Sequence, residues 1–305
     1  MLVHHLLRGT ILSGFAFLIV YLTKTDQLAL YIAPRMATYV KLSAIGLYAA
    51  SMYQFYLVFR IWSGSRTEPD CDCDHTPSPS LTKNTMIYGL FLLPLCLGFL
   101  LPNTIMDSTI AAKKGMSLNG AINIARPSEA KASGTGNSPS LADASPSNST
   151  QGRAAPSPDD MFPSDVYTES YAAYAKKLYT QDLIEVSEKQ FIEILTTLDL
   201  YREPFLGKQV ALSGFVYREP EMSASRFALS RFAMNCCSAD ALPYGLMVTY
   251  PKAEKYKNDT WLKITGTLEL SEYKGNPVLQ LKAAELESIP APDSPYVYPD
   301  YDFGS

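Results

Sequence analysis

Histidine is scarce in this chain of 305 residues: the three are His4, His5 and His75. The C-terminal half therefore offers no imidazole for general-base catalysis, and no Ser-His-Asp set, P-loop or HExxH motif is present. Cysteine is nearly as rare, with five in all. Only two of them follow residue 100, which excludes a disulfide-stapled C-terminal scaffold. These absences argue against an enzyme.

An excess of basic residues is also lacking in the C-terminal half. Residues 161–305 contain 14 Lys and Arg against 20 Asp and Glu. Because binding to a nucleic-acid backbone requires a basic groove, the charge argues against it even where aromatic residues could stack on bases. We expect no nucleic-acid partner.

Charged residues are nearly absent from three apolar runs near the N-terminus, residues 6–22, 37–59 and 85–102. Membrane-spanning helices need about 17–25 such residues. No small-residue cleavage site follows the first run, which indicates an uncleaved anchor rather than a signal peptide. Three buried helices of a soluble domain are the alternative, but such long uncharged runs are unusual in soluble cores. We expect a membrane region over residues 1–110, surrounded by lipid.

The orientation in the cell membrane follows from weaker signals. Lys and Arg near the spans number four on each side, so the positive-inside rule decides little. The N-terminus with His4 and His5 favours a cytoplasmic start. Three spans then place the C-terminal domain outside the cytoplasm.

The remaining chain divides into a tether and an outer domain. Residues 111–164 are rich in Ser, Pro and Ala, a composition typical of a flexible tether. In residues 165–305, helical spacing precedes five strand patterns, with glycine at 214 and 266. Such a pattern favours a small all-β barrel of the OB type with a preceding helix, and a small β-sandwich is the alternative. Gly214 also indicates a β-bulge or a sharply coiled strand. The predicted strands are residues 210–217, 227–236, 245–250, 261–270 and 278–286.

A thiol motif, Asn235-Cys236-Cys237-Ser238-Ala239-Asp240, ends the second predicted strand. Cys236, Cys237 and Asp240 are candidate ligands for a soft divalent metal. A fourth ligand would have to come from another carboxylate or a partner chain. Adjacent cysteines rarely bond to each other, because their Cα atoms lie only about 3.8 Å apart. If the strand continues, one thiol points inward and one outward. Alternatively, one packs in the barrel and the other caps a turn.

Two arginines and a second cluster complete the candidate residues. Arg218 and Arg231 are candidates to orient Asp240 or an anionic ligand, with simple surface salt bridges as the alternative. In the loop between the second and third spans, Asp70-Cys71-Asp72-Cys73-Asp74-His75 concentrates metal-ligating groups. Cys71, Cys73 and His75 therefore predict a mobile metal site, and a solvated acidic loop is the alternative.

Seven motifs are spread along the chain: Tyr31-Ile32-Ala33-Pro34-Arg35, Leu93–Pro102 with Asp107-Ser108, Gly207–Val210, Ser213–Arg218, Arg231-Phe232 through Cys236–Ala241, Trp261–Gly266 and Pro292–Pro299. Together they resemble the YcgQ-like family of membrane proteins, which are described as permease subunits. The resemblance covers nearly the whole chain except the tether, and it implies a bacterial cell-membrane protein. It also implies a partner, a multi-span permease of a class linked to efflux of organoarsenicals or other small solutes. Many members have a histidine-rich loop where this chain has Cys71, Cys73 and a single His75.

We therefore expect a non-enzymatic accessory subunit of a membrane permease. Its outer domain would present Cys236, Cys237 and Asp240 to a soft ion, a thiol-reactive solute or the partner. The alternative is a membrane-anchored thiol redox or metal-delivery protein that acts without a permease. The alternative predicts an exposed thiol of low pKa.

Overall fold

The computed structural model describes residues 2–64, 80–100, 106–118 and 161–305. The chain forms two compact units. Residues Met1–Ile105 and Met234–Ala241 make up the first, here called the helical unit. Residues Met106–Ala233 and Leu242–Ser305 make up the second, the sheet unit. The short loop 234–241, which contains the thiol motif, thus belongs with the N-terminal helices.

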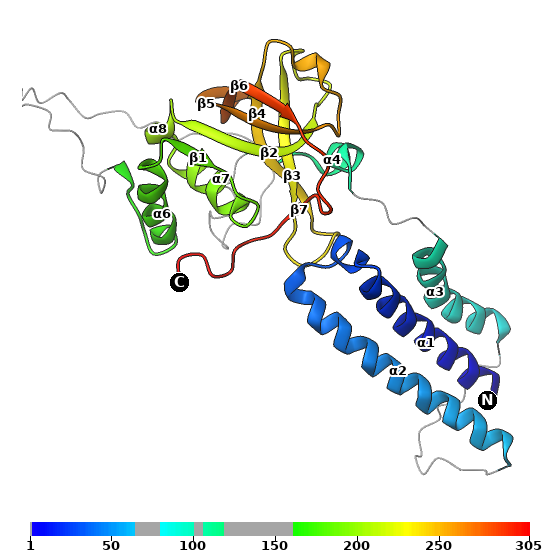
Figure 1. Ribbon diagram of the computed structural model, residues 1–305. Coiled ribbons are helices and arrows are strands. Elements are labelled where there is room, and N and C mark those ends of the chain that lie inside the picture. The colour runs from blue at the N-terminus through cyan, green and yellow to red at the C-terminus, as the bar shows by residue number, and fades with distance from the viewer. Residues whose placement is uncertain (1, 65–79, 101–105, 119–160) are drawn as a thin grey trace, which may run out of the picture. The chain divides into compact units, whose positions relative to one another are not determined.

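The helical unit contains three long helices, α1 (Leu2–Lys24), α2 (Pro34–Trp62) and α3 (Leu81–Leu100). All three are long and apolar enough to cross a membrane, which confirms the predicted set of N-terminal helices. A 3₁₀ helix, η1 (Gln27–Leu30), lies in the connection between α1 and α2. Figure 1 shows α1 beside both α2 and α3, in the blue to cyan part of the ribbon.

Small residues let the three helices approach one another closely. A Cβ placed on Gly9 of α1 would meet the ring of Phe55 on α2 at 3.2 Å, and the buried Ser51 hydroxyl donates to the Gly9 carbonyl at 2.8 Å. A Cβ on Gly14 would lie 2.5 Å from Leu95 of α3. Close backbone approach and hydrogen bonds between helices hold membrane helices together, because apolar burial gives little driving force in lipid.

Among the described residues, the sheet unit has seven strands, two more than the sequence predicts. Their order is β1-β2-β5-β6-β4-β3-β7, and β2 also pairs with β3. The pairings of β2, β5, β6, β4 and β3 therefore return to their starting strand, and the β4–β6 pair is parallel. The strands are β1 (Leu183–Glu185), β2 (Gln209–Tyr217), β3 (Arg226–Ala233), β4 (Leu242–Thr249), β5 (Trp261–Tyr273), β6 (Asn276–Ser288) and β7 (Tyr296–Val297).

Gly214 marks a close approach of two strands, where the sequence had predicted a β-bulge or a sharply coiled strand. It pairs in register with Leu262, and a Cβ at this position would lie 2.5 Å from the backbone oxygen of Ser230 on β3. The register shift of the sheet lies instead between Thr265 and Gly266, where β5 pairs with β6. The glycine is thus required because no side chain fits between β2 and β3.

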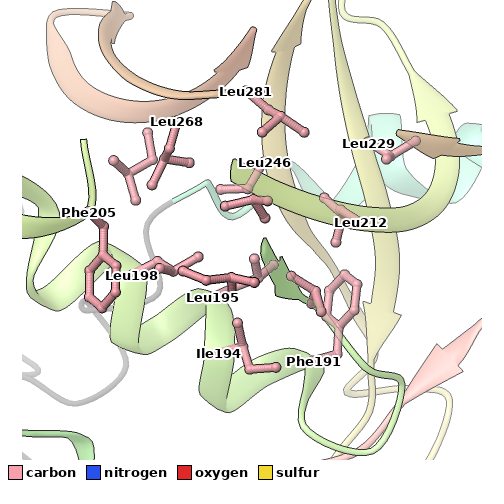
Figure 2. Packing of buried hydrophobic residues seen from close by; sticks show 14 of the residues in the cluster. Phe191, Ile194, Leu195, Leu198, Phe205, Leu212, Leu229, Leu246, Leu268 and Leu281 are labelled. Carbon is pink, nitrogen blue, oxygen red and sulfur yellow. The ribbon is translucent and has the colours of Figure 1, made fainter. Parts of the chain in front are cut away.

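The core of the sheet unit forms where helix α7 (Phe191–Leu200) covers the strands. Figure 2 shows Phe191, Leu195 and Leu198 of the helix on the side of the sheet leucines, and Ile194, which belongs to the same buried cluster, on the other side of the helix. This spacing places one apolar face of the helix on the core. Nearby lie α6 (Glu169–Tyr179), α8 (Arg202–Phe205) and the 3₁₀ helix η3 (Ala253–Lys255).

A segment that precedes the undescribed residues 119–160 also belongs to the sheet unit. Its helix α4 (Ser108–Lys114) begins after Asp107, whose carboxylate accepts from the backbone N–H of Thr109. Ser108 donates to the Asp259 carboxylate through both its backbone N–H and its hydroxyl, at 2.7 and 2.6 Å. These contacts fasten the chain to the sheet unit soon after α3.

The C-terminal residues form a strap over α6 and α7. Strand β7 pairs with β3, and the Asp300 backbone N–H donates to the buried Glu193 carboxylate at 2.7 Å. Phe303 contacts the rings of Tyr171 and Tyr174. Burial raises the pKa of Glu193 above its ordinary 4.5. The hydrogen bond from the Asp300 backbone lowers the pKa, but its effect is smaller. Glu193 is thus a buried acid at the strap.

We predict that Glu193→Gln stabilises the sheet unit at neutral pH. The pKa of Glu193 is raised in the folded state. The protonated acid therefore stabilises the fold fully below about pH 4.5, and this stabilisation is lost as the pH rises through the raised pKa. Thermal unfolding of the full chain in detergent should show the variant a few degrees more stable at pH 8 and equal to wild type below pH 4. The exposed Glu203→Gln is the control. A gain that persists unchanged at low pH would contradict the prediction.

Candidate thiol site

The thiol motif lies in the loop between β3 and β4, not on a strand. Strand β3 ends at Ala233, three residues before Cys236, so the expected alternation of one inward and one outward thiol was wrong. Both thiols are half-buried, and their sulfur atoms lie 3.6 Å apart. The strand ends early because the next backbone N–H groups bind a side chain instead of a neighbouring strand.

That side chain is Asp240, which folds the loop around its carboxylate. Its two oxygens accept hydrogen bonds from the backbone N–H groups of Asn235 at 2.9 Å, Cys236 at 2.7 Å and Cys237 at 3.3 Å. The Asp240 backbone N–H donates back to the Cys237 carbonyl at 3.0 Å. Partial burial alone would raise the pKa of Asp240. The hydrogen bonds from the Cys236 side chain and from the backbone have a larger combined effect and lower the pKa below 3.8.

The folded loop pairs with the connection between α1 and α2. The Ala33 N–H donates to the Cys236 carbonyl at 3.0 Å, and the Ser238 N–H donates to the Tyr31 carbonyl at 2.8 Å. Ile32 and Cys237 form an antiparallel bridge between these bonds. The thiol pair is therefore held on the residues that lead into α2. The sequence gives no signal for this pairing, because about 200 residues separate the two segments.

A side-chain contact extends the same pairing. Arg35, in the first turn of α2, donates to the Asn235 side-chain oxygen at 3.1 Å. Asn235 thereby receives a hydrogen bond from the helix while its own backbone N–H donates to Asp240. The Arg35–Asn235 contact connects the membrane helix to the first residue of the motif.

The electrostatics of the loop keep Cys236 protonated. Hydrogen bonds to Asp240 and to Cys237 raise the pKa of the Cys236 thiol from 9.0 to about 11. A thiol of this kind is a poor nucleophile at neutral pH, since the thiolate is the reactive form. A metal ion that bound here would have to displace a proton, and its affinity would rise with pH.

The donor set suits a soft cation. One ligand atom each from Cys236, Cys237 and Asp240 lie within 4.8 Å of one another. Two sulfurs and a carboxylate oxygen can occupy three positions around a soft divalent ion. Asp240 accepts three backbone hydrogen bonds and one from the Cys236 thiol, and loss of the thiol proton on metal binding frees a lone pair for the ion. A closed tetrahedral site needs a fourth ligand, which these three residues do not supply.

The two arginines expected to support the site have partners of their own. Arg218 donates to the backbone carbonyls of Ala253 and Tyr256, at 2.8 and 3.3 Å. Arg231 is almost fully buried and pairs with Glu188. These contacts brace the sheet unit and give no support to a role in orienting Asp240.

Arg231 has further contacts on the strap side of the sheet. It donates to the Ser294 carbonyl at 3.1 Å and lies 5.3 Å from the ring centre of Trp261. The predicted metal loop of Cys71, Cys73 and His75 lies outside the described residues.

The helices, the sheet and the thiol loop define a class, a membrane protein with a C-terminal sheet domain and a dithiol motif. Comparison with known families matches residues 7–117 to the DUF1980 N-terminal domain and residues 161–299 to the DUF1980 C-terminal domain. The chain is 28% identical to the UPF0703 protein YcgQ of Bacillus subtilis, over 95% of this chain and 98% of that protein. The chain belongs to this YcgQ-like family.

A second relative has a more informative name. The chain is 27% identical to a Streptococcus mutans protein named "Putative two-component membrane permease complex subunit". The match covers 68% of this chain and 72% of that protein.

We predict that Asp240→Asn changes the reactivity of the thiol pair. The substitution removes the negative charge that raises the pKa of Cys236, so the pH midpoint of Cys236 alkylation should fall from about 11 towards 9. Mass spectrometry of iodoacetamide-treated full-length protein across pH measures this midpoint. Asp182→Asn, an exposed aspartate elsewhere in the chain, should leave it unchanged. An unchanged midpoint in Asp240→Asn would contradict the described geometry.

Proposed function

We propose that this protein is a non-enzymatic accessory subunit of a multi-span membrane permease. In this proposal the loop 234–241 presents Cys236, Cys237 and Asp240 to a soft metal ion or a thiol-reactive solute. The main support is the pairing of this loop with the α1–α2 connection, through the Ala33 and Ser238 hydrogen bonds. The name of the Streptococcus mutans relative supports the class of partner.

The surface of the helices is consistent with a partner in the membrane. Almost all side chains of α3 are exposed within the described chain, including Leu90 and Leu93. In a membrane such a helix packs against other helices or against lipid. We propose that the helices of this chain do both, and that α3 faces the permease. A bundle of three helices with this little mutual burial gains most of its packing from outside the chain.

The sheet unit supports the expected OB-like barrel. Five strands whose pairings return to the first strand, with one parallel pair, fit a small closed Greek-key barrel. We propose a membrane region within residues 1–110, a tether within 111–164 and an OB-like domain over 165–305, with residues 106–118 packed on that domain rather than in the membrane or the tether. We further propose that this domain lies outside the cytoplasm.

We propose a soft divalent metal as the ligand of the thiol pair. Adjacent cysteines are disfavoured as a disulfide, so they persist as a dithiol that chelates. The fourth ligand comes from the permease or from another carboxylate. The alternative, a redox or metal-delivery protein without a permease, requires a thiol of low pKa. The raised pKa of Cys236 favours chelation over redox chemistry.

We predict that Cd²⁺ binds the thiol pair in the full-length protein in detergent. In a background with Cys71 and Cys73 replaced by Ser, equilibrium dialysis should find one ion per chain. Cys236→Ser or Cys237→Ser should weaken binding by about 100-fold or more, since loss of even an outer-shell partner costs 10–100-fold. Cys96→Ser, a thiol on α3, is the control. Equal Cd²⁺ affinity in all variants would exclude the thiol pair as the site.

We predict that a polytopic membrane protein co-purifies with the tagged chain from membranes of its own organism in mild detergent. The expected ratio is one to one by quantitative mass spectrometry. A tagged, unrelated three-span protein is the control for non-specific capture. A chain that purifies alone, and still binds Cd²⁺ through the thiol pair, would favour the metal-delivery alternative.

A further inference from the structure

A groove runs along the helical unit between α1 and α2. Its volume is about 410 Å³, within the range of about 300–1,000 Å³ typical of small-molecule sites. Two buried alanines, Ala16 of α1 and Ala44 of α2, form its floor. Phe17 and Ile45, both largely exposed, form walls beside the floor. The groove is apolar except where Lys41 and Ser13 line it.

Lys41 gives the groove a charged end. It lies seven residues after Pro34, the first residue of α2, and so about 10 Å along the helix axis. With 29 residues, α2 is about 44 Å long, well beyond the hydrocarbon thickness of about 30 Å. When the helix is centred in the bilayer, the Lys41 backbone lies about 3 Å inside the hydrocarbon layer, and its long side chain extends to the lipid headgroups.

The Lys41 charge has no carboxylate partner within the described part of the helical unit. No ion pair involves Lys41 among residues 2–64, 80–100 and 234–241. A cation on a membrane helix is costly unless a counter-charge lies close to it. The apolar groove continues from Lys41 towards Tyr48, that is, into the hydrocarbon layer.

We infer that the groove binds one anionic phospholipid, with its phosphate at Lys41 and an acyl chain along Ala16 and Ala44. A helix of a partner protein fits the groove less well. A single turn of an α-helix, about 10 Å across, already takes up about the whole volume of the groove. A single acyl chain fits a narrow floor of two alanines between larger side chains. The inference depends neither on the thiol site nor on a permease.

The test uses the full-length protein reconstituted in vesicles of equal parts phosphatidylglycerol and phosphatidylcholine. After mild extraction, native mass spectrometry should find one retained phosphatidylglycerol per chain. Lys41→Gln should lower that occupancy about fivefold, as expected for one lysine at a charged headgroup. Lys83→Gln, a lysine on α3, should leave the occupancy unchanged.

A second pair of variants tests the apolar part. Ile45→Ala removes a wall of the groove and should lower retention, whereas Ile87→Ala on α3 should not. Circular dichroism checks that each variant keeps its helices. Equal retention of both lipids, or unchanged retention in Lys41→Gln, would overturn the inference. A photo-crosslinker at position 45 that labels a polypeptide instead of lipid would overturn it as well.

Discussion

The structure of the thiol motif depends on the Asp240 carboxylate. Three consecutive backbone N–H groups, those of Asn235, Cys236 and Cys237, point at its two oxygens. Because these donors are used within the loop, β3 cannot extend past Ala233, and the two thiols emerge on the same side of a turn. A carboxylate that serves three backbone donors is fixed in place, so its distance to both sulfurs is set by the loop itself.

The same turn leaves backbone groups on its outer side for the helical unit. The Cys236 carbonyl and the Ser238 N–H pair with Ala33 and Tyr31, immediately before α2 begins at Pro34. Any ligand that reorients the Cys236 peptide therefore acts on a hydrogen bond made by the residue preceding a membrane helix. This pairing is a direct physical route from the thiol loop to the helices, and it lies within the helical unit.

The periodic elements could be predicted from the sequence, and the pairings between distant segments could not. Uncharged runs predicted α1, α2 and α3, and alternation predicted the five central strands, since both depend on local composition. Strands β1 and β7 are three and two residues long, too short to leave a period. The motif residues Cys236, Cys237 and Asp240 were selected by their chemistry, and the structure places their ligand atoms close together. Their placement on a loop, and the buried pairing of Arg231 with Glu188, depend on tertiary contacts that no local pattern encodes.

The central claim is that the thiol loop is paired with the α1–α2 connection. Residue-resolved hydrogen exchange of the full-length protein in detergent tests it directly, at the backbone amides of Ala33 and Ser238. These two amides donate to the Cys236 and Tyr31 carbonyls, and the account predicts that both are protected and lose protection together in Asp240→Asn. Exchange of both amides at the rate of an unstructured peptide in the wild-type protein would contradict it.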